Sequence, residues 1–130
     1  MIVIDCSYAL ALVMPDEERP NSMAEVQADL LFAPAVWPME MANAFVMAVR
    51  RGRVTSDAAA RMALRMDEYL VNVDVEPIAI HAGYLAAQNH ALSANDAAYL
   101  ELALQRRCGL ATLDRRLAAR AHDLGLTVFS

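Results

Sequence analysis

Four acidic residues occupy positions from which they could bind one metal ion together: Asp5, Glu40, Asp96 and Asp114. Cys6 has no CxxC partner and no His at metal-ligand spacing, so the candidate ligands are carboxylate oxygens. Such ligands favour Mg²⁺ or Mn²⁺ over Zn²⁺. A hard cation held by carboxylates activates water and stabilises phosphoryl oxygens, so these residue types indicate phosphodiester chemistry.

Each of these acids also has a purely structural explanation. An acid in the first turn of a helix, as Glu40 and Asp96 would be, interacts favourably with the helix dipole by about 0.3 to 1 kcal/mol. Asp114 could cap a following helix. Asp5 is harder to explain in this way, because a carboxylate at the end of a buried strand needs a partner or a metal. Together the four would repel one another, by about 1 to 4 kcal/mol for each pair at about 4 Å, unless a cation is bound.

The elements that must position these residues follow from the hydrophobic pattern. Short apolar, β-branched runs alternate with longer helical patterns. The predicted strands are Ile2–Asp5, Leu30–Ala33, Val71–Glu76, Gly109–Leu113 and Leu126–Phe129. The predicted helices cover residues 7–14, 21–29, 37–51, 55–70, 80–90, 93–107 and 115–124. Ser7 could cap the first helix, Thr55 or Ser56 the fourth, and Ser93 or Asn95 the sixth.

This alternation implies right-handed crossovers and an α/β fold of three layers, with a parallel sheet between helices. In such sheets the functional crevice lies outside the carboxyl ends of the strands, where the strand order reverses. Asp5 ends the first predicted strand and Asp114 directly follows the fourth. Glu40 and Asp96 lie in first helical turns, which a chain leaving the sheet often places at the same edge.

The composition sets the class of protein. The 130 residues are about one domain's worth, and the 58% hydrophobic content excludes disorder. No apolar run reaches the roughly 18 residues of a spanning helix, and Asp5 interrupts the first apolar segment without a basic region before it. We therefore expect a cytoplasmic protein with no membrane partner. Cys6 and Cys108 are expected to be reduced, buried thiols.

The charges are unevenly distributed. The net charge is −5, which by itself argues against a nucleic-acid binder. The arginines nevertheless form two clusters, one of Arg50, Arg51, Arg53, Arg61 and Arg65 and one of Arg106, Arg107, Arg115, Arg116 and Arg120. These clusters are interpreted either as basic patches for RNA or as solvated helical faces.

The segments around the four acids resemble those of the PIN-domain family, especially the VapC-type toxins of prokaryotic toxin–antitoxin pairs. The resemblance covers nearly the whole chain and lies in four motifs. These are IVIDCS at residues 2–7, EMAN at 40–43, HALSANDAAYL at 90–100 and LATLDRRL at 110–117. One departure is Asn95, at a position that is commonly aromatic in toxins of this type.

The resemblance implies a single PIN-like domain over residues 1–130, with a five-stranded parallel sheet. It implies that Asp5 and Asp96 are the principal ligands of Mg²⁺ or Mn²⁺ and that Glu40 and Asp114 complete the acidic site. Further residues that it assigns to the site are Ser7 and Thr112, as hydroxyl side chains that line it, and Asn43. Asn43 lies one helical turn from Glu40 and could orient its carboxylate.

The activity implied by the resemblance is that of a metal-dependent endoribonuclease toxin. A water molecule, deprotonated with help from a carboxylate, would attack the phosphate in line and leave 5′-phosphate and 3′-hydroxyl ends. The implied partners are an RNA substrate, a small antitoxin that wraps the helices near the site, and a second copy of the chain in a homodimer.

Other classes of acidic α/β protein fit the sequence less well. Haloacid-dehalogenase-like phosphatases and receiver domains rely on a lysine near the phosphoryl group, and this chain has no lysine. Dinucleotide-binding and P-loop folds need glycine-rich turns, whereas the four glycines here are scattered. One alternative stays open: a catalytically silent PIN-like module that binds RNA or protein. Metal titration would separate it from the nuclease.

Overall fold

The centre of the molecule is a five-stranded sheet in which every neighbouring pair of strands is parallel. The computed structural model describes residues 1–130. Its strands are β1 (Ile2–Ile4), β2 (Leu31–Ala33), β3 (Val71–Val73), β4 (Gly109–Ala111) and β5 (Val128–Phe129). They lie in the order β3-β2-β1-β4-β5. The predicted five-stranded parallel sheet is therefore confirmed.

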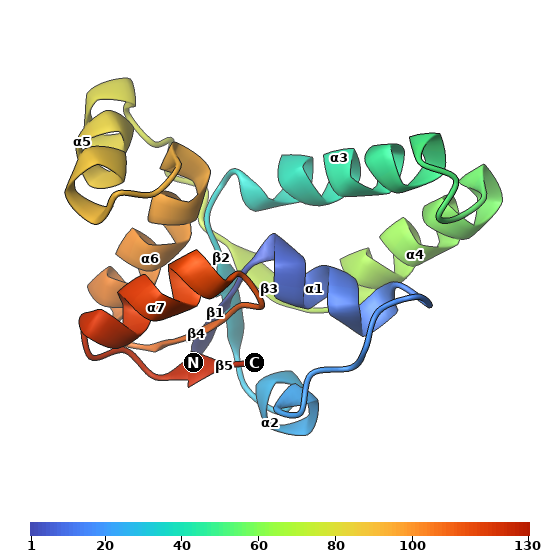
Figure 1. Cartoon of the computed structure of the whole chain (residues 1–130), viewed down its shortest axis with the longest axis horizontal. Coiled ribbons are helices and arrows are strands. Elements are labelled where there is room, and N and C mark those ends of the chain that lie inside the picture. The colour runs from blue at the N-terminus through green and yellow to red at the C-terminus, as the bar shows by residue number, and fades with distance from the viewer.

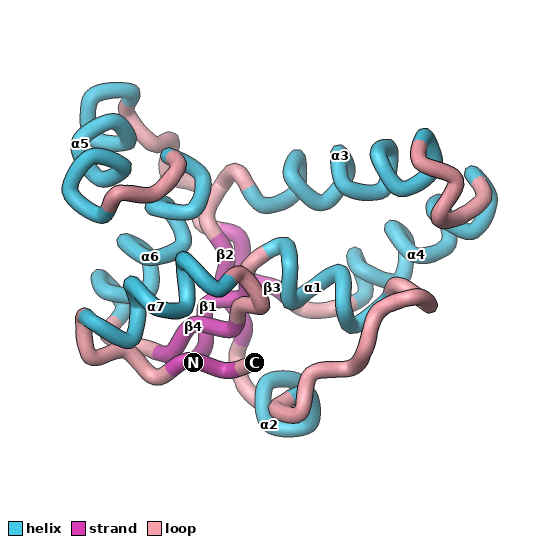
Figure 2. The backbone as a smooth tube through the Cα atoms, viewed as in Figure 1, coloured by secondary structure: helices cyan, strands magenta, loops and turns pink.

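Seven helices surround this sheet. They are α1 (Cys6–Val13), α2 (Met23–Gln27), α3 (Trp37–Arg50), α4 (Ser56–Glu68), α5 (Ile80–His90), α6 (Ala94–Arg106) and α7 (Arg115–Asp123). Figure 1 shows α1, α3 and α4 on one side of the sheet and α6 and α7 on the other. In Figure 2 the strands run between these two groups, and α5 packs outside α6. The predicted three-layer α/β class is confirmed.

The strand order reverses at β1, which lies between β2 and β4. From β1 the chain proceeds outward to β2 and β3, and then returns to the other side of β1 to form β4 and β5. The carboxyl ends of β1 and β4 therefore flank the switch point, where open parallel sheets bind ligands. Asp5 extends this pairing, because its main-chain N–H donates to the Ala111 carbonyl oxygen at 3.0 Å.

The core is formed by the central strands and the helices packed on them. All three residues of β1 are at most 1% exposed. An unbroken apolar run such as Ile2–Ile4 is expected of a strand covered on both faces. Tyr8 of α1, Leu100 of α6 and Leu117 of α7 are also fully buried. The sheet is thus held rigidly under the residues that follow its strands.

Two predicted boundaries beside the site are wrong by a few residues. β1 ends at Ile4, and α1 begins at Cys6 with Asp5 as its cap; Ser7, the predicted cap, lies inside the helix. The Asp5 side chain accepts a hydrogen bond from the Tyr8 main-chain N–H, which satisfies a free donor at the start of the helix. β4 ends at Ala111, so that a short turn separates it from Asp114. Both acids therefore belong to turns that follow a strand.

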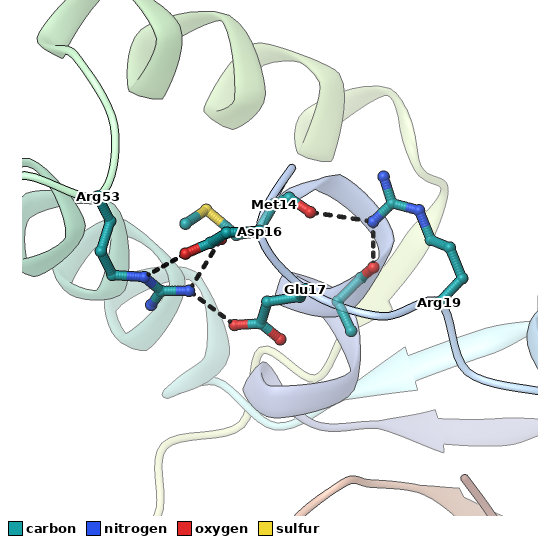
Figure 3. Close-up of polar contacts among 6 residues, drawn as sticks. Met14, Asp16, Glu17, Arg19 and Arg53 are labelled. Atoms are coloured by element: carbon teal, nitrogen blue, oxygen red, sulfur yellow. Dashed lines mark hydrogen bonds and ion pairs between the residues drawn. The ribbon is translucent and has the colours of Figure 1, made fainter.

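The segment between α1 and α2 is attached to neighbouring elements by two arginines (Figure 3). Arg53, just after α3, donates to Asp16 at 2.9 Å and to Glu17 at 3.0 Å. Arg19 donates to the main-chain carbonyl oxygens of Ala11 and Met14, at the end of α1. Positive charge at a helix C-terminus is favourable. Arg53 is thus occupied within the protein.

Two further findings concern the composition. Cys6 and Cys108 are free thiols, as expected, but both are half-buried, not fully enclosed. None of the helices combines the length and the apolar character needed to cross a bilayer.

Candidate active site

Asp5 is the most enclosed acid of the molecule, with 4% of its surface exposed. Three neighbouring groups donate hydrogen bonds to its carboxylate. The Tyr8 N–H and the Ser7 hydroxyl reach Oδ1 at 2.8 Å, and the Thr112 hydroxyl reaches Oδ2 at 2.5 Å. Ser7 also lies 2.9 Å from Oδ2. The carboxylate is therefore fixed in position by its own helix and by the turn after β4.

The two hydroxyls are themselves oriented by main-chain donors. Ser7 Oγ accepts the Leu113 N–H at 2.9 Å, and Thr112 Oγ1 accepts the Asp114 N–H at 3.0 Å. Each hydroxyl has a single proton. Because a main-chain donor already approaches each oxygen, both hydroxyl protons are directed to Asp5. The structure thus places Ser7 and Thr112, two residues assigned to the site from the sequence, in direct contact with Asp5.

Burial dominates the acid–base behaviour of Asp5. Removal from water raises its pKa from 3.8 to about 6, against the three hydrogen bonds, which lower it. The negative charge of Asp114 adds a smaller upward contribution. No arginine or histidine forms an ion pair with Asp5. A buried carboxylate with no cationic partner is a strong candidate for a cation ligand or a proton acceptor.

Asp114 caps helix α7 with one of its two oxygens. Its Oδ1 accepts the Arg116 and Leu117 N–H groups, each at 2.9 Å. The structural explanation foreseen for this residue therefore applies. Its Oδ2 accepts no hydrogen bond within the protein and is free for another ligand.

Glu40 lies in the first turn of α3 and is half-buried. Two residues of α6 hold its carboxylate. Asn95 Nδ2 donates to Oε1 at 2.9 Å, and the Tyr99 hydroxyl donates to Oε2. The bond expected from Asn43 is not formed, since Asn43 is exposed and makes no side-chain hydrogen bond. The Glu40 carboxylate is therefore oriented by residues of α6 and not by another residue of α3.

Asp96 is half-buried in the first turn of α6, between Asn95 and Tyr99 in the sequence. Its N–H donates to the hydroxyl of Ser93, which is the cap of this helix in preference to Asn95. The carboxylate itself has no hydrogen bond or ion pair within the protein. Asp96 therefore lies at the same end of α6 as Asn95 and Tyr99, which bind Glu40.

The charges of these acids also act on the thiol of Cys6. Burial raises its pKa to about 12, with further upward contributions first from Glu40 and then from Asp5. Glu40 and Asp5 therefore both lie near this side chain. A thiol with so high a pKa stays protonated at neutral pH in the metal-free protein, so it is a poor nucleophile.

Whether these residues fit a metal ion depends on their chemistry and on their arrangement. In the structure no three His, Cys, Asp or Glu side chains converge closely enough to hold an ion. The donor set fits a hard cation, because it is made of carboxylate oxygens without a positive partner. Asp96 has a free carboxylate, Asp114 a free oxygen, and Asp5 an unfavourable buried charge. Side-chain movements would be needed to bring three of them onto one ion.

Most arginines of the second cluster, residues 106–120, are engaged within the protein. Arg116 and Arg120 donate to the main-chain carbonyls of Ala91 and Asn89, at the end of α5. Arg106 lies 4.3 Å from the ring centre of Phe32. Arg115 follows Asp114 directly, is exposed and makes no ion pair or hydrogen bond. It is thus the arginine next to the acids that is free to contact a phosphate.

Sequence reasoning missed the roles of Tyr99 and Asn95. Tyr99 could be taken for an ordinary core residue, since it is 1% exposed and follows the apolar pattern of α6. Its contact with Glu40 joins residues 59 positions apart. The one available signal was Asn95, a polar residue where the resembled toxins are commonly aromatic.

Comparison with known proteins gives consistent results. The family model described as PIN domain matches residues 2–123. Ribonuclease VapC3 of Pyrobaculum aerophilum is 31% identical over 122 residues, which cover 92% of this chain and 93% of that protein. The crystal structure of PAE2754 from Pyrobaculum aerophilum superposes with a TM-score of 0.70 at 25% identity, covering 98% of this chain and 82% of the other. Mycobacterium tuberculosis VapC20, a sarcin–ricin loop cleaving toxin, shares the fold with a TM-score of 0.61 at 16% identity, over 92% and 94% of the two chains.

Proposed function

The chain belongs to the PIN domain family, and on this basis we propose that it is a metal-dependent endoribonuclease that acts as the toxin of a toxin–antitoxin pair. The observation that carries the proposal is the environment of Asp5. It is a buried carboxylate at the switch point of the sheet, held by three donors, close to a second acid and without a cationic partner.

We assign Asp5 and Asp96 as the principal ligands of Mg²⁺ or Mn²⁺, with Glu40 and Asp114 completing the site. When bound, such an ion supplies activation of water and stabilisation of phosphoryl oxygens. The chain's own residues supply orientation. Ser7 and Thr112 fix the Asp5 carboxylate, Asn95 and Tyr99 fix that of Glu40, and we assign Glu40 to accept a proton from water.

The proposed substrate is RNA, and the free arginine beside the acids supports this choice. Arg115 is exposed next to Asp114, where it could bind a phosphate flanking the scissile bond. Four further arginines are exposed and unpaired: Arg50 and Arg51 at the C-terminal end of α3, and Arg61 and Arg65 along α4. Such unpaired cations can attract a polyanion despite the net charge of −5.

The proposed protein partner is an antitoxin, and an apolar groove supports this part of the proposal. The groove has a volume of about 310 Å³ and lies between α3, α4 and β3, on the helix that carries Glu40. Its lining includes Trp37, Met41, Phe45 and Met66. Methionine and aromatic side chains adapt readily to an inserted helix.

We further propose a homodimer in the cytoplasm. Residues 77–95 contain no Asp, Glu, Lys or Arg, and α5 within this segment has no buried residue. Ile80 is 93% and Tyr84 58% exposed. A neutral, apolar helix is the part of an acidic chain that a second copy can approach without charge repulsion. The free thiols of Cys6 and Cys108 suit a reducing compartment.

Cleavage of RNA by purified protein, free of any antitoxin, tests the proposal. Structured cellular RNAs would be incubated with Mg²⁺, Mn²⁺ or EDTA and with the variants Asp5→Asn and Asp96→Asn. Asp57→Asn is the matched control, because it makes the same change at an exposed first turn of α4. We expect metal-dependent cuts that both site variants abolish and the control retains. Cuts that persist in both site variants would contradict the assignment of the ligands.

One observation favours the alternative of a silent binding module. No three of the acids converge on one point as the structure stands. Titration with Mn²⁺ distinguishes the two functions. A nuclease must bind the ion at a site that Asp5→Asn removes, whereas a silent module shows neither binding nor cleavage.

A further inference from the structure

Glu40 is held by two side chains that reach it from another helix. Asn95 and Tyr99 are four residues apart on α6, so they project from the same face of that helix. One donates to each oxygen of the carboxylate, Asn95 at 2.9 Å. We call these two residues the Glu40 clamp. The clamp joins the first turn of α3 to the first turns of α6.

The two donors differ in their surroundings. The Tyr99 hydroxyl belongs to a side chain that is 1% exposed and has no other recorded partner in the protein. Asn95 is exposed, and its amide donates to the other oxygen of the carboxylate. Glu40 is therefore fixed from the core and from the solvent side at once.

We propose that Asn95 and Tyr99 are positioning residues, which hold the Glu40 carboxylate ready for its role in the site. The inference rests on the nuclease function proposed above and assigns two further residues to it. A carboxylate oxygen has two lone-pair directions. After one bond to the clamp, each oxygen of Glu40 keeps one direction free for water or a cation.

A clamp of this kind matters because glutamate is flexible. Its side chain has three rotatable bonds, and one in the first turn of a helix would otherwise extend into solvent. The clamp also fixes one acid relative to another. Asp96 lies between the two clamp residues on α6, so the contacts that hold Glu40 also hold the two helices that carry these acids. The geometry of the pair is set by α6.

The test compares Tyr99→Phe and Asn95→Ala with two matched controls. Asn21→Ala removes an exposed amide just before α2 that makes no side-chain hydrogen bond, and Tyr84→Phe removes an exposed hydroxyl on α5. The readouts are the dissociation constant of Mn²⁺ alone, measured by calorimetry, and kcat and KM for a cleaved RNA. Thermal denaturation establishes that each variant is folded, and Asn95→Ala serves if Tyr99→Phe is not.

We expect each clamp variant to weaken Mn²⁺ binding or lower kcat by about 10- to 100-fold, as for other residues that support metal ligands. KM for RNA and both controls should change little. A second set of variants carries Glu40→Ala. If the clamp acts through Glu40, then Tyr99→Phe and Asn95→Ala cause no further loss in that background.

The outcomes separate the clamp from the function on which it rests. A wild type that binds Mn²⁺ or cleaves RNA, with clamp variants equal to it, overturns the clamp alone. Equal losses with and without Glu40 also overturn it, because they indicate a merely structural role. A wild type that neither binds Mn²⁺ nor cleaves RNA overturns both proposals, since Glu40 then has nothing to act on.

Discussion

Replacement of Asp5 by asparagine should stabilise the metal-free protein while removing its proposed function. Burial raises the pKa of Asp5 from 3.8 to about 6, so keeping this carboxylate ionised in the fold costs about 3 kcal/mol at neutral pH. Asparagine has no charge to bury and caps helices as well as aspartate does. Its amide nitrogen cannot accept the bond from Thr112 or Ser7, and the loss of one such bond costs about 1 kcal/mol. The expected net gain is about 2 kcal/mol.

The gain should depend on pH in a defined direction. Because the folded pKa is raised, the folded state binds the proton more tightly than the unfolded chain does. The stability that the fold gains from protonation of Asp5 is complete below about pH 4 and is lost as the pH rises through 6. The stability of Asp5→Asn relative to the wild type should therefore increase from pH 4 to pH 7 and then become constant.

Chemical and thermal denaturation in EDTA, at pH 5 and pH 8, measures this difference. For a chain of this length, 2 kcal/mol corresponds to roughly 6 to 10 °C in the midpoint of thermal unfolding. Addition of Mg²⁺ at about 100 times its dissociation constant should stabilise the wild type by about 2.7 kcal/mol and the variant far less, which reverses their order.

Two results would refute the reasoning about Asp5. A variant less stable than the wild type in EDTA at both pH values would mean that the hydrogen bonds fully compensate the buried charge. An equal response of both proteins to Mg²⁺ would mean that the ion binds elsewhere.

Three further predictions concern other parts of the molecule. Because its pKa is raised to about 12, the Cys6 thiol should be alkylated by iodoacetamide at pH 8 much more slowly in the folded protein than in urea, as followed by mass spectrometry; equal rates would contradict its enclosure. Arg115→Ala should weaken RNA binding and reduce the salt dependence of the affinity by about one phosphate contact, whereas Arg53→Ala, whose side chain is already paired, should leave that slope unchanged; equal slopes would remove Arg115 from the interface. Gly109→Ala should destabilise the protein by about 1 to 3 kcal/mol in urea denaturation, because the added Cβ would lie 2.5 Å from the Phe129 ring and 3.2 Å from a main-chain oxygen; an unchanged midpoint would show that β5 moves aside freely.

The elements of the fold could be predicted because their signals are local. The apolar period identified the helix Ile80–His90 to the residue, and the β-branched runs located all five strands. The ends of the strands were harder, since an apolar run continues into the turn after β4 and hides the point at which pairing stops. Asp5 and Ser7 are equally good helix caps, and only the three-dimensional geometry distinguishes them.

The partners of the candidate site residues depend on tertiary packing and could not be predicted. A helical period places Asn43 on the same face as Glu40, but it cannot show that Tyr99, on another helix, is nearer. Similarly, the arginine clusters gave no indication that Arg53 and Arg116 bind groups of the protein itself. The sequence predicts which residues form the candidate site, and the packing of α3, α6 and α7 determines how each one is held.

The position of β1 in the middle of the sheet has a consequence for the order in which the protein is made. The hydrogen bond between Thr112 and Asp5 joins residues 107 positions apart, and β4 forms the second edge of β1. At typical ribosomal speeds, the interval between synthesis of these two segments is on the order of 5 to 20 seconds. Throughout that interval the nascent chain carries its first acid but lacks the turn that fixes it. A chain that is released before β4 is made therefore lacks Thr112 and Asp114, so the proposed site can be complete only when translation is nearly done.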